Sequence, residues 1–394
     1  MHQPLTLSAK EAAAELGVSL PTLYAYVSRG LIRSEAPAGG RTRLYRADDV
    51  RALVTRRDRP ADMAGERALD WGAPVLESAI TLITGDGLYY RGRDAVVLAA
   101  GATLETVAAL LWEVAEAPFT EPPPVLPSPE AGLAALDPLD RLLALLPTAA
   151  AGDLRSMNRT PLGLARTGAR ILRMMAGVLA QARPSQQPLH RQLADAWGVT
   201  GEGVDLIRGA MVLCADHELN ASAFTVRCVA STGANPYAAL SAGIGALRGP
   251  RHGGMTARVA ALLPGLLTGP DPVQSLSAFL ARGEELPGFG HPLYPRGDVR
   301  AAWLLRRMAA AWPQDDRLHR ALALAKAATD LAGSPPTIDF ALVLLADRLG
   351  LPAHAPITLF TVGRSVGWVA HLLEQVRSGM LIRPRARYTG LRPG

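Results

Sequence analysis

The sequence predicts a protein built mainly from α-helices, and its composition and apolar patterning both point to that class. Hydrophobic residues make up 49% of the chain but aromatic residues only 5%, so Leu, Ala and Val must fill the core. Ala and Leu favour helices, whereas β-branched and aromatic residues favour strands. From Trp71 onward one stretch of helical apolar spacing follows another, as in residues 103–112, where Thr103 can cap a helix. The predicted fold class is therefore mainly all-α.

The length of the chain predicts more than one domain. Its 394 residues exceed what one ordinary core organises, which indicates two or three domains. The polar junction RRDRP (residues 56–60) marks a boundary, so we assign residues 1–58 to a first domain and residues 59–70 to a linker. The proline-rich residues 121–129 cannot be helical and predict an extended surface loop.

The sequence predicts a cytoplasmic protein. Lys10 is followed by EAAAEL, which contains two acidic residues, rather than by the apolar core of a signal peptide. No apolar run reaches the roughly 18–20 residues that a membrane helix needs, so no membrane partner is expected. The two cysteines, Cys214 and Cys228, are far from CxxC spacing, and we expect both to be inert thiols.

Positive charge gathers at the N-terminus. The formal net charge is +6, of which residues 1–59 hold +4, from 10 Lys and Arg against 6 Asp and Glu. A basic segment of this kind suits a polyanion such as nucleic acid.

The first 50 residues predict a helix, a tight turn, a second helix and a basic hairpin. Ser8 and Glu11 fit a capping box at the start of a helix that Gly17 ends. A second helix then runs to Gly30, and residues 39–46 predict a hairpin or wing before a third helix that starts with the letters DDV. This order of elements is typical of a helix-turn-helix.

Residues 5–57 resemble the winged helix-turn-helix domains of the MerR and excisionase type, which implies DNA as a partner. In such domains the second helix enters the major groove. The resemblance implies DNA contacts from the second helix and the wing, by Thr22, Tyr24, Tyr26, Arg29, Arg41 and Arg43. A domain that serves only for packing or for contacts within a dimer is the alternative.

Three of the eight histidines lie in contexts unlike an ordinary helix interior. A zinc-protease helix around His217 would need a second histidine at position 221, where the chain has Ala221, so that metal site is excluded. His252 in GPRHGG (249–254) and His291 in GFGHPLYPRGDVR (288–300) lie at glycine- and proline-rich breaks. Such breaks often carry functional side chains, so both histidines are candidates for chemistry.

Asp339 is a fourth candidate, and one tempting motif is rejected. Asp339 follows a proline break in PTIDF (336–340), where it is either a helix N-cap or a partly shielded base. The letters GRSVG (363–367) match a nucleophile elbow, but that motif needs a strand, a turn and a helix. Here the flanking residues predict one continuous helix, so we reject a hydrolase site.

Taken in order, these segments resemble the citrate synthase family over about residues 70–394. The motifs ADHELNAS (215–222), GPRHGG, GFGHPLYPRGDVR and PTIDF carry the resemblance, with spacings of 35, 39 and 48 residues from His217 through to Asp339. Residues 87–113, GRSVGWVAHLLEQ (363–375) and residues 382–390 extend it. The family fold implies a large helical domain, residues 71–255 with 361–394, and a small helical domain, residues 256–360, that closes over the substrates.

The resemblance implies a carbon–carbon bond-forming acyltransferase of the tricarboxylic acid cycle. It would condense acetyl-CoA with oxaloacetate and water to give citrate and CoA, with no cofactor beyond the CoA thioester and no metal. Asp339 is then expected to remove a methyl proton, and His252 to hydrogen-bond the thioester oxygen of the enolate or enol. His291 is expected to polarise the ketone of oxaloacetate and to supply a proton.

The family pattern also implies substrate-binding residues and a homodimer. His217, Arg300, Arg364 and Arg383 are expected to bind oxaloacetate, because arginines suit its carboxylates. In the family the arginine that matches Arg383 comes from the other subunit, which implies shared sites. Arg296 is the candidate ligand of a CoA phosphate.

Several departures from the family pattern leave the acyl group open. Arg251, Met255 and Thr256 replace the usual neighbours of the first catalytic histidine, and Pro292 and Pro295 replace basic or polar residues after the second. A 2-methylcitrate synthase using propionyl-CoA is therefore one alternative. A metabolite-sensing DNA-binding regulator built on the same domain is another.

Overall fold

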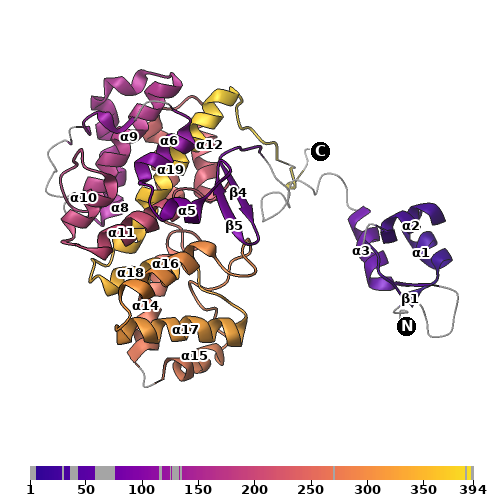
Figure 1. Cartoon of the computed structure of the whole chain (residues 1–394). Coiled ribbons are helices and arrows are strands. Elements are labelled where there is room, and N and C mark those ends of the chain that lie inside the picture. The colour runs from indigo at the N-terminus through magenta and orange to yellow at the C-terminus, as the bar shows by residue number, and fades with distance from the viewer. Residues whose placement is uncertain are drawn as a thin grey trace. The chain divides into compact units, whose positions relative to one another are not determined.

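The structure is a computed structural model, and it divides into two compact units, Met1–Glu77 and Ser78–Gly394 (Figure 1). The residues it describes are 6–28, 31–35, 43–57, 76–114, 118–124, 126, 133, 135–268, 271–386 and 388–391. The predicted linker, residues 59–70, and the DNA-contact candidates Arg29 and Arg41 lie outside this described part of the chain.

Among its described residues, the first unit has three helices and a small antiparallel sheet around a core of its own. Its elements are β1 (Thr6–Leu7), α1 (Ala9–Leu16), α2 (Leu20–Ser28), β2 (Ser34–Glu35), β3 (Leu44–Arg46) and α3 (Ala47–Arg57), with strand order β1-β3-β2. Both bonds of the predicted capping box are present: Ser8 N–H donates to Glu11, and Glu11 N–H donates to Ser8 Oγ. Gly17 ends α1 in the left-handed conformation, with φ of 62°. The third helix begins one residue earlier than predicted, at Ala47.

The second unit opens with a three-stranded antiparallel sheet and continues almost entirely as helices. The strands are β4 (Thr81–Thr84), β5 (Gly87–Tyr90) and β6 (Arg93–Asp94). The short elements that follow are α5 (Ala95–Ala99), α6 (Leu104–Trp112), η2 (Pro118–Thr120) and η3 (Leu154–Met157). As predicted, Thr103 caps α6 by accepting a bond from Thr106 N–H, and the helix ends at Trp112.

The long helices of the second unit gather around α19 (Ala355–Ser378), which is buried along most of its length. They are α8 (Pro138–Gly152), α9 (Pro161–Leu179), α10 (Leu189–Ala196), α11 (Glu202–Leu213), α12 (Ala221–Ser231) and α13 (Pro236–Leu247). Of these, α9, α11, α12 and α13 pack directly on α19, together with α6. Figure 1 shows α19 in yellow, running between these helices.

Five further helices, salmon to orange in Figure 1, pack mainly on one another. They are α14 (Met255–Thr268), α15 (Pro272–Leu280), α16 (Val299–Ala311), α17 (Asp316–Ala332) and α18 (Ile338–Arg348). Helix α18 also contacts α19, and α16 contacts α11, so this group meets the rest of the unit along those helices. A small domain over residues 256–360 stays a prediction.

The described helices include none that is both long and apolar enough to cross a membrane.

Candidate active site

Five segments that are distant in sequence bring the candidate residues together in the second unit. They are the turn after α11, the loop between α13 and α14, the loop between α15 and α16 together with the first turn of α16, the first turn of α18, and the middle of α19. The three histidines, Asp339 and two of the predicted arginines lie on these segments. The cluster is therefore a product of the tertiary fold.

His252 lies in the loop that joins α13 to α14, and its ring is held by a serine. Ser222 Oγ lies 2.8 Å from His252 Nε2, and it also accepts a hydrogen bond of 3.0 Å from Trp368 Nε1. The same hydroxyl is 2.7 Å from Asn220 Oδ1. Burial, with Arg364 nearby, lowers the pKa of His252 to about 4, so its imidazole is neutral at neutral pH.

His291 sits on a glycine turn that is fastened to the start of α18. Gly288 has φ of 82°, and a Cβ there would lie 2.5 Å from Val259 Cγ2, so only glycine fits. Gly290 N–H donates to Pro335 O at 2.8 Å, and Thr337 N–H donates to Gly288 O at 2.9 Å. This bridge fixes the loop of His291 against the residues that precede Asp339.

The ring of His291 has a defined tautomer. Leu293 N–H donates to His291 Nδ1 at 3.2 Å. Burial and the charge of Arg300 lower the pKa of His291 to about 4, so the ring is neutral and its single proton resides on Nε2. His291 can therefore donate a hydrogen bond from Nε2 to a carbonyl oxygen.

Asp339 is the second residue of α18 and not its N-cap. The cap position belongs to Thr337, so the N-cap alternative is wrong. Burial raises the pKa of Asp339 to about 6, against an opposing effect of Arg300. A carboxylate with a pKa in that range is ionised at neutral pH and is a stronger base than an ordinary aspartate.

Asp298 holds Arg300 and the start of α18 in one arrangement. Its carboxylate accepts two bonds from the Arg300 guanidinium, Nε at 2.9 Å and Nη2 at 2.8 Å. Its Oδ2 also accepts Ile338 N–H at 2.9 Å, one residue before Asp339. Asp298 and Arg300 are each 2% exposed, so the pair is held in the interior of the fold.

His217 lies beside other residues that we predict to bind oxaloacetate. Its Nε2 is 3.0 Å from the hydroxyl of Tyr294, and its ring centre is 5.2 Å from that of His291. Burial lowers its pKa well below the usual value, and the charges of Arg300 and Arg364 act in the same direction. His217 is therefore a third neutral imidazole beside two cations.

Arg364 is a buried cation with an unfilled donor. Its side chain is 1% exposed and stacks over the ring of Phe360, with 4.7 Å from the guanidinium carbon to the ring centre. Nε donates to Cys214 O at 2.9 Å, but Nη2 is buried without a hydrogen-bond partner among the described residues. An orphaned donor on a buried cation fits an anionic ligand.

Two predicted binding residues are not part of this cluster within one chain. Arg383 is exposed in the tail that follows α19. Arg296 is 72% exposed and forms an ion pair of 2.8 Å with Asp86, in the turn between β4 and β5. Both assignments stay predictions.

Sequence reasoning missed Ser222, Tyr294 and Asp298. Only Asp298 carried a local signal, because it precedes α16 as its N-cap and stands two residues before Arg300. Sequence reasoning was right about GRSVG (363–367), which lies inside the uninterrupted helix α19 and forms no nucleophile elbow.

Comparison with known proteins decides the family. The family description "Citrate synthase, C-terminal domain" matches residues 127–385, about two thirds of the chain. The chain belongs to the citrate synthase family. The description "Helix-turn-helix domain" matches residues 6–58 of the first unit.

Relatives of this citrate synthase family member include proteins that are named for different products, citrate and 2-methylcitrate. "Citrate synthase 2" of Bacillus subtilis is 36% identical over 190 residues, 48% of this chain and 51% of that protein. "2-methylcitrate synthase 1" of Corynebacterium glutamicum is 32% identical over 185 residues, 46% and 49% of the two chains. The chain thus spans about half the length of the curated relatives it matches.

The fold also matches solved citrate synthases. The enzyme of Thermotoga maritima aligns with a TM-score of 0.68 and 25% identity, over 82% of this chain and 95% of that one. The Pyrobaculum aerophilum enzyme aligns with a TM-score of 0.68 and 22% identity, over 82% and 91%.

Proposed function

We propose that this family member is an acyltransferase that condenses acetyl-CoA with oxaloacetate and water, giving citrate and CoA. The observation that carries the proposal is the convergence of three neutral histidines, one carboxylate of raised pKa and two buried arginines. This set supplies a base, hydrogen-bond donors for a developing oxyanion, and cations for a dicarboxylate.

The first step is proton abstraction beside the thioester. Asp339 removes a methyl proton from acetyl-CoA, and His252 stabilises the negative charge on the thioester oxygen by donating a hydrogen bond. A neutral His252 can donate from Nδ1 only if Nε2 accepts. The Ser222 hydroxyl has one proton and two possible acceptors, Asn220 Oδ1 at 2.7 Å and His252 Nε2 at 2.8 Å. The proposed step requires that the hydroxyl donates to Nε2, which leaves Asn220 Oδ1 with the bonds from Ser222 N–H and Ala223 N–H.

The second step forms the carbon–carbon bond. The enol carbon attacks the ketone carbon of oxaloacetate, and His291 Nε2–H donates to the ketone oxygen, which becomes the hydroxyl of the product. Arg364 Nη2, which has no hydrogen-bond partner in the described part of the chain, and Arg300 bind the carboxylates, with His217 as a further ligand. Water then hydrolyses the citryl thioester and releases CoA, so the sequence of steps involves no change of oxidation state that would call for a redox cofactor.

Turnover with purified protein tests this proposal. Thiol release from acetyl-CoA should depend on oxaloacetate, and Asp339→Asn, which keeps size and removes the base, should lower kcat by roughly 10²–10⁴-fold. Asp330→Asn on the exposed end of α17 is a control that should keep wild-type turnover. Absence of thiol release by the folded wild-type protein with either acetyl-CoA or propionyl-CoA would refute the enzyme assignment.

Which acyl-CoA the protein uses is a separate question, and propionyl-CoA is the alternative substrate. One methylene in an apolar pocket discriminates by only about 1–3 kcal/mol. A ratio of kcat/KM above tenfold in favour of one thioester in the same assay assigns the substrate.

We also propose that the first unit binds DNA, on the strength of its helix-turn-helix layout and its match over residues 6–58. Tyr24 on α2 is 51% exposed and Thr22 is partly exposed, whereas Tyr26 packs partly against the core of the unit. Tyr24, Thr22 and Arg43 are therefore the described residues best placed for contacts.

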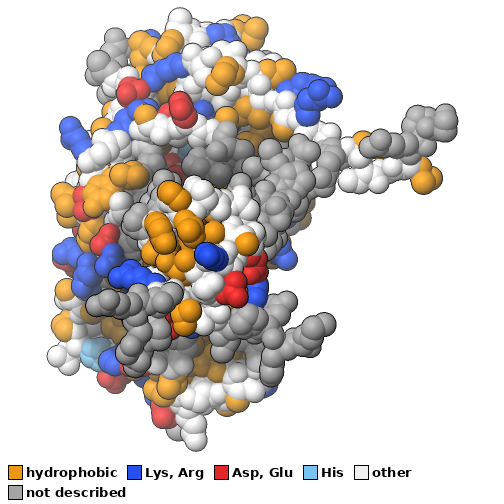
Figure 2. Space-filling view, turned by 90° about the vertical axis from the view of Figure 1, so that its right-hand side faces the viewer, with side chains coloured by type: hydrophobic (Ala, Val, Ile, Leu, Met, Phe, Trp, Pro, Cys, Tyr) orange, Lys and Arg blue, Asp and Glu red, His pale blue; other side chains and the backbone are white. Residues whose placement is uncertain are grey.

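The basic excess of this unit is smaller than its composition suggests. Arg33 forms a bidentate pair with Asp49, and Arg51 pairs with Glu15. Figure 2, which draws both units, shows Lys and Arg side chains among Asp, Glu and hydrophobic side chains, for the residues drawn in colour. Binding to DNA should therefore rest on few phosphate contacts and have a shallow salt dependence.

Fluorescence anisotropy with labelled genomic fragments tests DNA binding. The full chain should bind at about 50 mM salt, with Tyr24→Ala and Arg43→Ala each weakening binding and Arg282→Ala, in the second unit, leaving it unchanged. No binding at low salt would leave packing or dimer contacts as the role of this unit. An affinity that changes with oxaloacetate would favour the metabolite-sensing regulator.

A further inference from the structure

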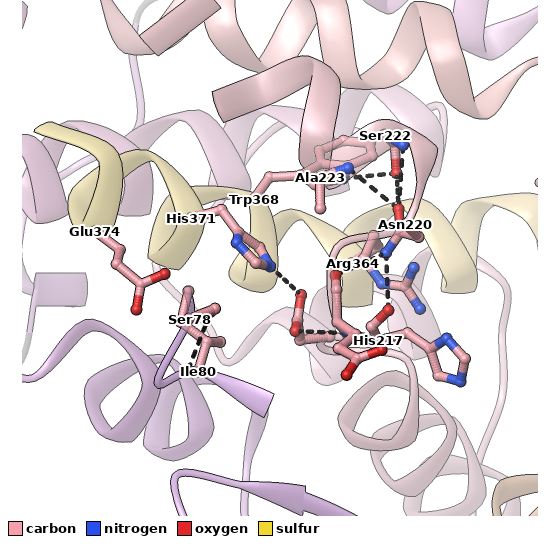
Figure 3. A network of polar contacts seen from close by, with 12 residues as sticks. Ser78, Ile80, His217, Asn220, Ser222, Ala223, Arg364, Trp368, His371 and Glu374 are labelled. Carbon is pink, nitrogen blue, oxygen red and sulfur yellow. Dashed lines mark hydrogen bonds and ion pairs between the residues drawn. The ribbon is translucent and has the colours of Figure 1, made fainter. Parts of the chain in front are cut away.

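One face of α19 is shaped to receive the segment that carries His217. Arg364, Gly367 and His371 follow one another at spacings of three and four residues, which places them on the same side of the helix. Figure 3 shows Arg364, Trp368 and His371 extending from this helix toward the turn of His217, Asn220 and Ser222.

Glycine lets that segment approach the helix backbone. Gly367 N–H donates to Ala215 O at 2.8 Å. A Cβ at position 367 would lie 2.2 Å from Asp216 Oδ1 and 2.5 Å from Ala215 O. The carboxylate of Asp216 therefore rests on the backbone of α19, between the side chains one turn before and one turn after Gly367.

Asp216 and His371 form a buried pair there. Both side chains are 0% exposed, and His371 Nε2 lies 3.3 Å from Asp216 Oδ1. Neither ring nitrogen of His371 nor Asp216 Oδ1 makes a hydrogen bond of good geometry among the described residues, so the pair is a close polar contact. Burial alone would raise the pKa of Asp216, yet His371 and Arg364 hold that pKa below its usual value. Asp216 thus stays charged beside the two groups of α19.

The other oxygen of Asp216 fixes the turn that presents His217. Asp216 Oδ2 accepts Glu218 N–H at 3.2 Å, and Glu218 has φ of 57°, which is unfavourable for a side chain of its size. The turn then ends at Asn220, whose Oδ1 caps α12. Asp216 therefore constrains the backbone on both sides of His217, whose Nε2 reaches the Tyr294 hydroxyl.

The same segment also orients Arg364, since Arg364 Nε donates to Cys214 O, two residues before Asp216. We propose that Asp216 and His371 are a positioning pair for the keto-acid half of the site, which sets His217 and Arg364 to bind the dicarboxylate. This inference rests on the proposed function. The pair is expected to affect the oxaloacetate-binding residues and not the residues that act on the thioester, because Asp339 and His252 lie on other segments.

The test of this pair compares the change in KM for oxaloacetate with the change in KM for the thioester. His371→Leu keeps the volume and removes the donor, so KM for oxaloacetate should rise at least tenfold while KM for the thioester changes less than threefold. His371→Gln, which keeps a donor toward Asp216, should restore KM for oxaloacetate to within about threefold of wild type. Asp216→Asn should reproduce the effect of His371→Leu.

A matched control separates positioning from stability. Gln375→Leu lies one turn further along α19, is equally buried and removes a bond from Arg227 Nε. It should lower the melting temperature without changing KM for oxaloacetate. If His371→Leu does not fold, the comparison of His371→Gln with Asp216→Asn decides, with far-UV circular dichroism as the check on folding.

Two results would count against the positioning pair, and a third would count against the proposed function. Equal rises in both Michaelis constants, or no rise for oxaloacetate in folded His371→Leu or Asp216→Asn, would overturn the positioning pair. Failure of wild-type protein to turn over oxaloacetate, and to bind it by calorimetry, would instead refute the proposed function.

Discussion

At the scale of single residues, burial decides which protonation state each group of the site has. Asp339 is shielded from water enough to raise its pKa to about 6, whereas the same burial lowers the pKa of His252 and His291 to about 4. Burial disfavours the charged form in both cases, so it makes the carboxylate more basic and the imidazoles neutral. All three groups therefore have the protonation states that the proposed steps require at neutral pH.

The pKa of Asp339 gives a pH dependence with a definite sign. Because the base must be ionised, kcat/KM should fall about tenfold per pH unit below pH 6 and be level above it. The two histidines stay neutral across that window and add no second limb until about pH 4. A pH–rate profile between pH 5 and 8 measures this, and a level profile would contradict the role of Asp339.

Stability should change with pH in the opposite direction at this residue. The pKa of Asp339 in the folded protein, about 6, exceeds the ordinary value of 3.8. Its contribution to the free energy of unfolding is therefore fully present below pH 3.8 and is lost as the pH rises through 6. Asp339→Asn should therefore be more stable than wild type at pH 8, by about 3 kcal/mol, and the gain should shrink at pH 5. Urea unfolding at both pH values checks it, and a gain that is equal at the two would be inconsistent with this linkage.

The orientation of His252 should depend on one hydroxyl. Ser222→Ala removes the partner of His252 Nε2 and of Trp368 Nε1, so kcat should fall by about tenfold or more, the equivalent of at least about 1.4 kcal/mol. Ser241→Ala in α13, which removes only a bond to Tyr237 O of its own helix, is the control and should keep wild-type turnover. Steady-state kinetics with a circular dichroism check compares the two, and equal kcat values would argue against the tautomer assigned to His252.

At the scale of elements, α19 shows how glycine spacing determines packing. Gly363 and Gly367 are one turn apart, and a Cβ at either position would meet backbone oxygen atoms of residues 211–215 at about 2.5 Å. The letters that mimic a nucleophile elbow are therefore a contact surface between α19 and the end of α11. The two glycines of the motif allow close packing, which brings Arg364 and the His217 segment together.

Two glycine substitutions should have opposite effects on stability. Gly367→Ala forces α19 away from Asp216 and should cost about 1–3 kcal/mol or more, together with keto-acid affinity. Gly245→Ala in α13 meets nothing within 4 Å and should stabilise by about 0.5–1 kcal/mol, because alanine favours the helix. Denaturant titration of both variants tests the contrast, which fails if Gly367→Ala is neutral.

At the scale of the whole molecule, the described residues form two hydrophobic cores, one in each unit. Residues such as Leu23, Ile32 and Val50 form the core of the first unit, and no residue of that core belongs to the core of the second among those described. Arg383, which we predict to bind oxaloacetate, lies exposed in the tail of the second unit. A site shared between two copies of the chain would supply it.

Mixing two inactive variants tests a shared site. In a homodimer with exchanged tails, an Asp339→Asn chain paired with an Arg383→Ala chain forms one site that has both wild-type residues. Co-refolding equal amounts should therefore restore turnover to about a quarter of the wild-type level, because half of the dimers are mixed and each has one intact site. The variants refolded separately and then combined without exchange are the control, and no recovery after co-refolding would refute the exchange of Arg383.

The sequence by itself determined the helical class, the ends of α1 and α6 and the identity of the candidate catalytic groups, because these depend on propensity, capping and short motifs. The tertiary structure decided which other side chains hold the candidate catalytic groups in place. Ser222 holds His252, Asp298 joins Arg300 to α18, and Asp216 rests on α19 across about 150 residues of sequence. It also showed that Asp339 is not a cap and that Arg33 is neutralised by Asp49. Such contacts follow from how helices pack, and local sequence does not encode packing.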